Sequence, residues 1–258
     1  MTDLPFDFLI VLIAAFGAGL IDAMVGGGGL IQLPALFAFY PQVAPPTLLG
    51  TSKLAGIFGT SSAVWRYAQR VRIPWRALFP LAVAVLIASW SGAMLATRVH
   101  PDVFRPLVPI MLVAVLAYTL WRKDLGVGHA PRGFAGRHHW IGAGAIAAIG
   151  FYDGFFGPGT GSFLMLVFVR CYGYDFLNAS ASARVLNVAA NGAALIYFTS
   201  RGYVLWQIGA AMAACNIAGS LVGARLALRG GSALVRKVFI VVVSLLIVRT
   251  AWVAVGSD

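Results

Sequence analysis

Long apolar runs, each about as long as a bilayer crossing requires, dominate the pattern of this 258-residue chain. They occupy 6–25, 46–65, 74–98 and 102–121 in the first half and 140–156, 177–198, 205–228 and 234–255 in the second. A helix rises about 1.5 Å per residue, so about 20 residues span the roughly 30 Å of hydrocarbon. Two shorter apolar runs, 30–40 and 161–172, follow glycine-rich stretches and predict half-length or re-entrant helices. The pattern predicts an all-α polytopic membrane protein with about five segments in each half.

Composition excludes a water-soluble fold. Hydrophobic residues make up 60% of the chain and charged residues only 10%, with a mean hydropathy of +0.87, whereas soluble domains carry about 25% charged residues. The net charge of +11 is concentrated in short loops between apolar runs, which is the pattern of topology signals and not of nucleic-acid binding. The two cysteines, Cys171 and Cys215, lie in apolar surroundings and form no disulfide or metal-binding pattern. We expect no cofactor, no metal and no nucleic-acid partner.

The two halves of the chain are copies of one sequence. A shift of 131 residues takes Asp22 to Asp153 and Lys53 to Arg184, a basic residue in place of a basic residue. The same shift, without gaps, matches Gly19, Gly26, Gly28, Trp75 and Ser89 with Gly150, Gly157, Gly159, Trp206 and Ser220. The chain therefore divides into repeat 1 (1–126), a link (127–139) and repeat 2 (140–258).

Loop charges predict that the two repeats have opposite orientations. The loop after the third segment of repeat 1 contains Arg66, Arg70, Arg72 and Arg76, whereas the matching loop of repeat 2 contains only Arg201. In the following loop the bias reverses, because repeat 2 has Arg225, Arg229, Arg236 and Lys237 there. Basic loops remain in the cytoplasm. We therefore expect inverted-topology repeats, a cytoplasmic link, and both termini on the non-cytoplasmic side.

Glycines interrupt the first segment of each repeat. The first break is GGGG at Gly26–Gly29, and the second is GPGTG at Gly157–Gly161. A half-helix that begins after such a break exposes backbone N–H groups and a partial positive charge, which attract an anion. Inverted repeats with broken helices at the centre are typical of secondary transporters, which bind substrate near the midplane. The alternative is that the glycines only allow close helix packing.

Four charged residues lie inside apolar segments: Asp22, Lys53, Asp153 and Arg184. Charges at this depth are costly and are usually paired and functional. We expect Lys53 and Arg184 to form the two walls of one anion site. The two aspartates would gate it, competing for these cations when the site is empty, and could also take up a proton. The alternative is a pair of structural ion bridges that lock the first segment of each repeat to the third.

The candidate site follows from these positions. The residues expected to bind substrate are Ser52, Lys53, Thr60, Arg184, Asn187 and Asn191, together with Gly27, Gly28, Gly29, Gly159, Thr160 and Gly161. Asp22 and Asp153 are the candidates for coupling or gating.

These motifs resemble a known family of membrane permeases. The stretches GxxDxxxGGGG and TSKLAG, and their counterparts DGFFGPGTGSF and SARVLN, are similar to those of the sulfite exporter TauE/SafE family. The resemblance covers nearly the whole chain. It implies transport, often export, of small sulfur-containing anions such as sulfite or organosulfonates. We expect alternating access around a midplane anion site in a bacterial inner membrane, with protons as a candidate coupling ion.

Two other functions are compatible with the sequence. The first is a membrane-embedded enzyme acting on lipid phosphates, with Ser182 near Arg184 and Asp153 as base; the second is an anion channel. An enzyme needs a nucleophile or general acid–base group beside the cations, but all four histidines lie outside the apolar runs. We therefore predict a transporter and not an enzyme.

Overall fold

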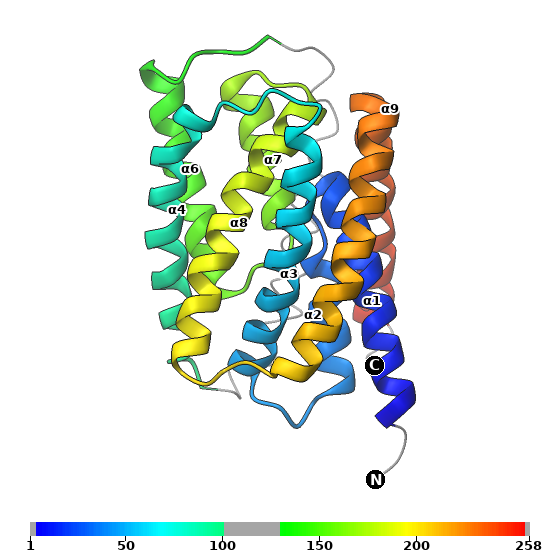
Figure 1. Cartoon of the computed structure of the whole chain (residues 1–258). Coiled ribbons are helices and arrows are strands. Elements are labelled where there is room, and N and C mark those ends of the chain that lie inside the picture. Colours follow the sequence, from blue (N-terminus) through cyan, green and yellow to red (C-terminus); the bar gives the residue numbers. More distant parts are fainter. Residues whose placement is uncertain (1–3, 101–129, 256–258) are drawn as a thin grey trace.

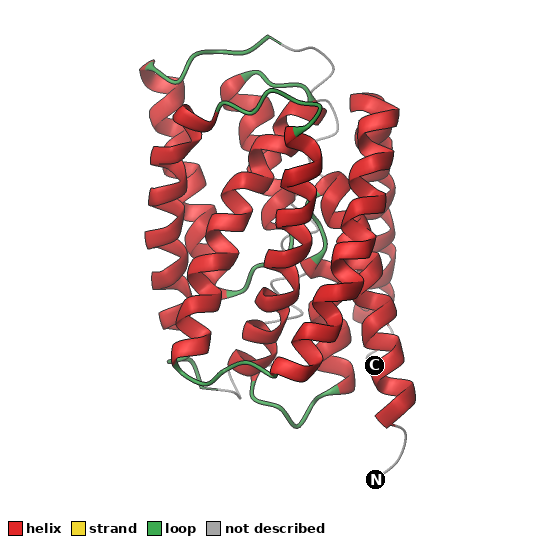
Figure 2. Ribbon diagram, in the orientation of Figure 1, coloured by secondary structure: helices red, strands yellow, loops and turns green. Residues whose placement is uncertain are grey.

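The computed structural model describes residues 4–100 and 130–255, and every regular element in these ranges is a helix (Figure 2). The helices are α1 (Leu4–Val25), α2 (Gly29–Phe39), α3 (Pro45–Ala68), α4 (Trp75–Ala96), α6 (Gly136–Phe155), α7 (Thr160–Tyr172), α8 (Phe176–Ser200) and α9 (Trp206–Val255). The predicted run 102–121, the repeat boundary at 126 and most of the link lie outside the described residues.

The helices coincide with the apolar runs in the part of the chain described. The short runs 30–40 and 161–172 correspond to α2 and α7, of 11 and 13 residues. The runs 205–228 and 234–255 both fall within α9, which is interrupted at Gly231 by a non-helical backbone (φ 62°, ψ −166°). The chain turns back at this residue (Figure 1). The predicted separation of two segments is therefore correct.

Three of the described helical stretches are long and apolar enough to cross a membrane: Phe6–Val25, Trp75–Ala96 and Trp206–Gly231. Helices α3 and α8 are equally long, at 24 and 25 residues, but less apolar. Their polar side chains are buried, among them Lys53, Thr60, Arg184 and Asn187. Polar residues within a membrane bundle face its interior, and this determines where α3 and α8 lie.

Helices α3 and α8 form the centre of the bundle, with α1 and α9 on one flank and α4 and α6 on the other (Figure 1). Small residues allow the flanking helices to pack closely, as is common in membranes. A Cβ at Gly92 of α4 would lie 2.0 Å from the carbonyl oxygen of Phe151 in α6, and one at Gly223 of α9 would lie 2.2 Å from that of Leu20 in α1. Gly92 and Gly223 are equivalent under the 131-residue shift, as are Leu20 and Phe151. Equivalent positions therefore make equivalent contacts.

Each short helix turns back toward the beginning of the helix before it. Leu36 of α2 shares a buried cluster with Val11 of α1, and Tyr172 at the end of α7 bonds His139 near the start of α6 (Oη to Nδ1, 3.1 Å). The α1–α2 pair opens at one end of the bundle and the α6–α7 pair opens at the other (Figure 1). Both glycine-containing turns consequently lie in the middle of the bundle.

Candidate functional site

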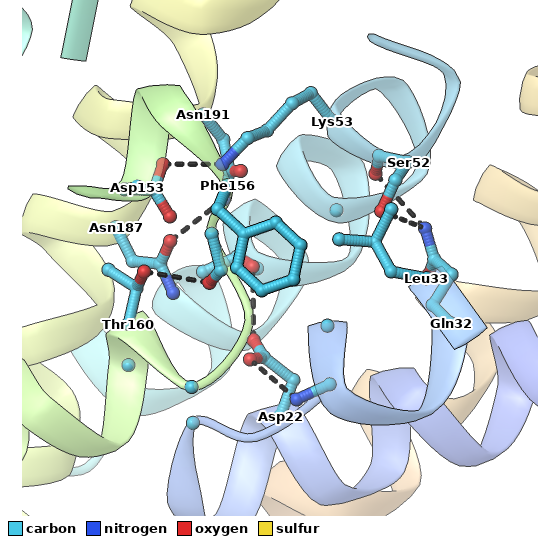
Figure 3. Close-up of a pocket in the computed structure, with 18 of the residues that line it drawn as sticks. Asp22, Gln32, Leu33, Ser52, Lys53, Asp153, Phe156, Thr160, Asn187 and Asn191 are labelled. Atoms are coloured by element: carbon cyan, nitrogen blue, oxygen red, sulfur yellow. Dashed lines mark hydrogen bonds and ion pairs between the residues drawn. The ribbon is translucent and has the colours of Figure 1, made fainter. Parts of the chain in front are cut away.

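A small polar cavity of about 50 Å³ lies where the two glycine-containing turns meet α3, α8 and α9 (Figure 3). Its polar side chains are those of Asp22, Gln32, Ser52, Lys53, Thr60, Asp153, Thr160, Asn187, Asn191 and Asn216. Glycines of both turns and a few apolar residues, including Leu33 and Phe156, complete the lining. A water molecule needs roughly 10–15 Å³ in such a space, so the cavity holds a few waters or one small ion.

The ends of two half-helices open on this cavity. α2 begins at Gly29 and α7 at Thr160, and the residues before them, Gly28 and Gly159, provide no side-chain cap. Left-handed backbone at Gly157 and Gly159 (φ 100° and 81°) makes the second turn possible, because residues with a Cβ rarely adopt it. The helix dipole gives each beginning a partial positive charge. Some of the first N–H groups already have protein acceptors, among them that of Gly28, which donates to Asp22, and that of Ser162, which donates to Gly26.

The two turns also touch each other. The backbone N–H of Ser162 donates to the carbonyl oxygen of Gly26 (3.1 Å), and the Ser162 hydroxyl donates to that of Val25 (2.7 Å). A Cβ on Gly26 would lie 2.2 Å from the carbonyl carbon of Gly161. Only glycine allows this approach, so the sequence brings the beginning of α7 directly against the end of α1.

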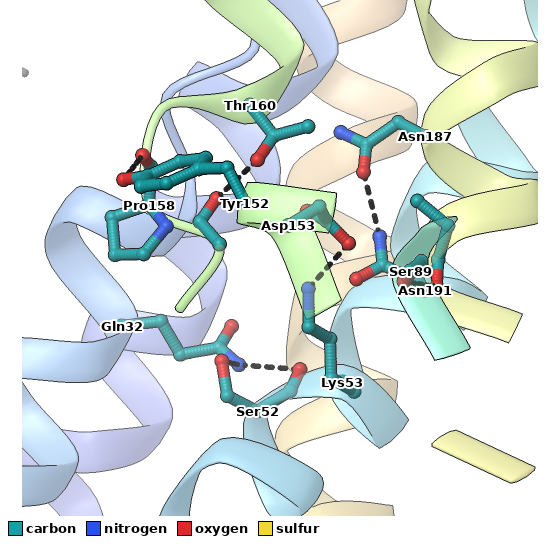
Figure 4. Close-up of polar contacts among 12 residues, drawn as sticks. Gln32, Ser52, Lys53, Ser89, Tyr152, Asp153, Pro158, Thr160, Asn187 and Asn191 are labelled. Atoms are coloured by element: carbon teal, nitrogen blue, oxygen red, sulfur yellow. Dashed lines mark hydrogen bonds and ion pairs between the residues drawn. The ribbon is translucent and has the colours of Figure 1, made fainter. Parts of the chain in front are cut away.

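Lys53 and Asp153 form a buried ion pair across the cavity. The Lys53 ammonium donates to Oδ2 of Asp153 at 2.6 Å, with side-chain exposures of 7% and 2% (Figures 3 and 4). The pair joins α3 of repeat 1 to α6 of repeat 2, and not the first and third segments of one repeat. A Cβ on Gly157 would lie 2.8 Å from the ammonium nitrogen. Because Gly157 has no Cβ, the second glycine turn leaves room for the Lys53 ammonium.

Asp22 lies on the same cavity but bonds to neutral donors. Its Oδ1 accepts the N–H of Gly28 (3.3 Å), and its Oδ2 accepts the hydroxyl of Thr60 (3.1 Å). Within residues 4–100 and 130–255, the ion pair identified is that of Lys53 with Asp153. The two equivalent aspartates therefore have different partners.

Arg184 lies outside the cavity lining. It is fully buried, and its guanidinium donates to the carbonyl oxygen (2.7 Å) and hydroxyl (2.5 Å) of Ser180 and to the carbonyl oxygen of Asp22. It also lies over the Tyr67 ring, 5.4 Å from the centroid. Nε of Arg184 has no hydrogen-bond partner among the described residues.

Arg184 is one of several side chains that complete the end of α1. The last carbonyl groups of a helix have no partner within it, and hydrocarbon offers none. The carbonyl of Asp22 accepts from Arg184 in addition to the N–H of Gly26, that of Ala23 accepts from Tyr67 (2.9 Å), and that of Met24 from Ser180 (3.2 Å). The Ser162 hydroxyl likewise donates to the carbonyl oxygen of Val25. Cationic and hydroxyl donors therefore stabilise the negative end of the α1 dipole.

Hydrogen-bonded amide side chains form other parts of the cavity lining (Figure 4). The Gln32 side-chain N–H donates to both the carbonyl oxygen and the hydroxyl of Ser52 (3.0 Å each), and Asn216 donates to Oε1 of Gln32 (2.9 Å). Asn191 donates to Oδ1 of Asn187 (2.8 Å). These bonds fix the amide dipoles that face the cavity.

The cavity contains most of the residues expected from the sequence. Asp22, Gly28, Gly29, Ser52, Lys53, Thr60, Asp153, Gly159, Thr160, Gly161, Asn187 and Asn191 line it, whereas Gly27 and Arg184 do not. Gln32 and Asn216 also line the cavity and were not among the residues expected to bind substrate. The signal for Gln32 was available, because it is the single amide in the apolar run after the first glycine turn.

Comparison with known proteins identifies the family. A model of the sulfite exporter TauE/SafE family matches residues 11–250. The chain belongs to the sulfite exporter TauE/SafE family.

Several relatives support this assignment to the TauE/SafE family. The chain is 36% identical over 250 residues to the probable membrane transporter protein ORF9 of Sinorhizobium sp, covering 96% of this chain and 94% of the relative. It is 32% identical over 249 residues to the probable membrane transporter protein YfcA of Escherichia coli K12, covering 96% and 91%. A probable membrane transporter protein of Haemophilus influenzae is 32% identical over 242 residues, covering 93% and 92%. No solved structure matches the chain significantly. The family and these names indicate a membrane transporter.

Proposed function

We propose that this TauE/SafE protein is a secondary transporter that exports small sulfur-containing oxyanions, sulfite or organosulfonates, by alternating access around the central cavity. The observation that carries the proposal is the meeting of two half-helix beginnings and the Lys53 ammonium at one buried, polar space. Helix beginnings bind anions through backbone N–H groups, and an ammonium adds a charge-assisted hydrogen bond.

The charges around the cavity favour uptake of a proton together with the anion. The lining contains two carboxylates, Asp22 and Asp153, and one ammonium, Lys53. When all three are ionised they sum to a formal charge of −1. The beginnings of α2 and α7 add about +0.5 each, and the ends of α1 and α6 at the same turns add about −0.5 each, so the sum stays near −1. Protonation of one carboxylate removes this negative charge, so the anion and a proton bind best together.

The directions of the two helix pairs support the inverted topology. The α1–α2 and α6–α7 pairs open at opposite ends of the bundle (Figure 1). The Arg66, Arg70, Arg225 and Arg229 side chains gather at one end, around a single cavity. We assign this arginine-rich end to the cytoplasm, because basic loops remain inside. The opposite end, where α1 begins, then faces the far side of a bacterial inner membrane.

The size and the lining of the cavity favour a transporter over the alternatives. A cavity of about 50 Å³ accommodates a small anion in an occluded state, which a channel lacks. A lipid-phosphate enzyme would require a nucleophile at the cavity. The candidate Ser182 is buried in α8 and is not among the lining residues.

Flux of radiolabelled sulfite in proteoliposomes, with and without a pH gradient, tests the proposal. We expect Lys53→Met to abolish saturable flux, and Lys53→Arg to retain part of it because a guanidinium also binds an oxyanion. Lys237→Met is the matched control, because Lys237 is exposed on α9 and its loss should leave flux unchanged. Equal flux by wild type and Lys53→Met, or flux insensitive to sulfite saturation, would exclude the central cavity as the transport site.

A further inference from the structure

A second cavity opens at the arginine-rich end of the bundle. It has a volume of about 660 Å³, and its lining contains four arginines, Arg66, Arg70, Arg225 and Arg229. The side chains between them are aliphatic, including Leu177 and Leu228. We call it the arginine cavity.

Three of the helices that line the central cavity, α3, α8 and α9, also contribute to the arginine cavity. α3 contributes Thr60 to the central cavity and Arg66 to the arginine cavity, which lie about 9 Å apart along the helix at about 1.5 Å per residue. α9 contributes Asn216 and Arg225, about 14 Å apart by the same rise. α8 likewise contributes Asn187 to the first and Leu177 to the second. One cavity thus follows the other along the bundle.

Two buried side chains lie near the junction of the two cavities. Arg184 lies between Leu177 and Asn187 on α8, and Tyr67 directly follows Arg66 on α3. Both are fully buried, and the Arg184 guanidinium lies over the Tyr67 ring. Ser180 bonds to Arg184 and lies within 3.3 Å of the Tyr67 hydroxyl. We call these contacts between α3 and α8 the Tyr67–Arg184 layer.

The lining of the arginine cavity contains four guanidinium groups and no carboxylate. None of its four guanidiniums forms a salt bridge among residues 4–100 and 130–255. Arg66 donates to the neutral Oε1 of Gln69 (3.2 Å), while Arg70, Arg225 and Arg229 are exposed. A cleft lined by one sign of charge concentrates counter-ions and raises association rates about 10- to 1,000-fold. Guanidinium groups also match the geometry of oxyanions.

We propose that the arginine cavity is a second anion-binding site, an antechamber that collects the transported oxyanion from the cytoplasm before it passes the Tyr67–Arg184 layer. This proposal rests on the proposed function, because it identifies the transported anion as the ligand. The cavity is much larger than the central one, about 660 Å³ against about 50 Å³. It therefore holds the anion hydrated and weakly, while the central cavity holds it stripped of water.

The test compares Arg70→Gln/Arg229→Gln with a matched control, Arg98→Gln/Arg201→Gln. The first variant removes two exposed charges from the arginine cavity. The second removes two exposed charges at the ends of α4 and α8, away from it. Sulfite flux from the arginine-rich face is measured against sulfite and salt concentration, and equilibrium binding of radiolabelled sulfite is measured in nanodiscs.

We expect the first variant to raise the half-saturating sulfite concentration about tenfold and to flatten its salt dependence, as loss of electrostatic steering requires. The maximal flux and the tight, salt-insensitive sulfite site should remain. Lys53→Met should show the reverse: loss of the tight site and retention of weak, salt-sensitive binding. The control should match wild type in every measurement.

Three outcomes would overturn the antechamber. One is an unchanged salt dependence in Arg70→Gln/Arg229→Gln. Another is equal loss of flux in the control variant. The third is a lipid headgroup in the site, shown if phosphatidylglycerol, compared with phosphatidylcholine, abolishes the weak sulfite binding of Lys53→Met. If neither site of the wild type binds sulfite, the proposed function itself fails, and this result is distinct from the loss of the weak site alone.

Discussion

Replacing Asp153 with asparagine tests whether this carboxylate competes with the substrate for Lys53. The Lys53 ammonium donates to Oδ2 of Asp153 at 2.6 Å. A hydrogen bond to a charged group contributes about 1.5–3 kcal/mol. An incoming anion must displace that bond, which costs this free energy. Without the carboxylate charge most of the cost disappears, so the anion binds more tightly.

The expected magnitude follows directly. Each 1.4 kcal/mol corresponds to about a tenfold change in Kd, so Asp153→Asn should bind sulfite about 10- to 100-fold more tightly. Net transport should slow, because the anion then leaves Lys53 less readily. Isothermal titration of sulfite into purified protein, with flux in proteoliposomes, measures both effects.

Thermal unfolding adds a second measurement on the same variant. Removing one partner of a buried ion pair costs about 3–5 kcal/mol when the other charge has no substitute. Asp153→Asn should therefore unfold at a lower temperature without anion. Sulfite at about 100 times its Kd adds about 2.7 kcal/mol of stability and should restore much of the loss.

Asp7→Asn, the same change in the first turn of α1, is the matched control and should leave Kd and flux unchanged. Asp22→Asn should change Kd less than Asp153→Asn, because the Asp22 carboxylate accepts from the neutral donors Gly28 and Thr60. Weaker binding by Asp153→Asn, as severe as that of Lys53→Met, would refute competition and make Asp153 a residue that holds the site together.

Three further results are expected. Arg184→Met should lower the unfolding temperature by several degrees, because Ser180 and the carbonyl of Asp22 lose a buried donor. Arg201→Met, at an exposed position, is the control. Equal stability of the two variants would contradict this role of Arg184. Gly157→Ala should weaken sulfite binding, because its Cβ would lie 2.8 Å from the Lys53 ammonium, whereas Gly144→Ala, with open space around it, should bind normally. The topology can be tested in a protein with Cys171 and Cys215 replaced by serine. Single cysteines at positions 70 and 229 should react with an impermeant reagent from the cytoplasmic side, and one at position 201 from the other side. Labelling of positions 70 and 229 from opposite sides would exclude the proposed topology.

Helix positions were predictable because apolar length and glycine interruptions are local properties. The runs 30–40 and 161–172 became α2 and α7, and the gap between 228 and 234 coincides with the reversal at Gly231. The set of polar residues near the glycine turns was also largely predictable, since a charge or amide inside a membrane segment must face an interior space.

The partners of those residues were not predictable. Spacing identifies Lys53 and Arg184 as equivalent, but it does not tell which helix faces them. Lys53 meets a carboxylate from the other repeat, whereas Arg184 meets backbone carbonyls at the end of α1. Any buried cation can be satisfied by either kind of oxygen, and only packing decides between them. The Gln32–Asn216 bond depends likewise on two residues that lie far apart in the sequence.

The contact between the two glycine turns has a mechanical consequence. Separating α1 from α7 requires breaking both bonds of Ser162, to Gly26 and to Val25, and each group left unpaired in a water-poor interior costs about 1–3 kcal/mol. The end of α1 and the beginning of α7 therefore act as a single joint. If the outer helices tilt during a transport cycle, both halves of the protein must pivot about this shared crossing, so that closing one face and opening the other is one movement and not two.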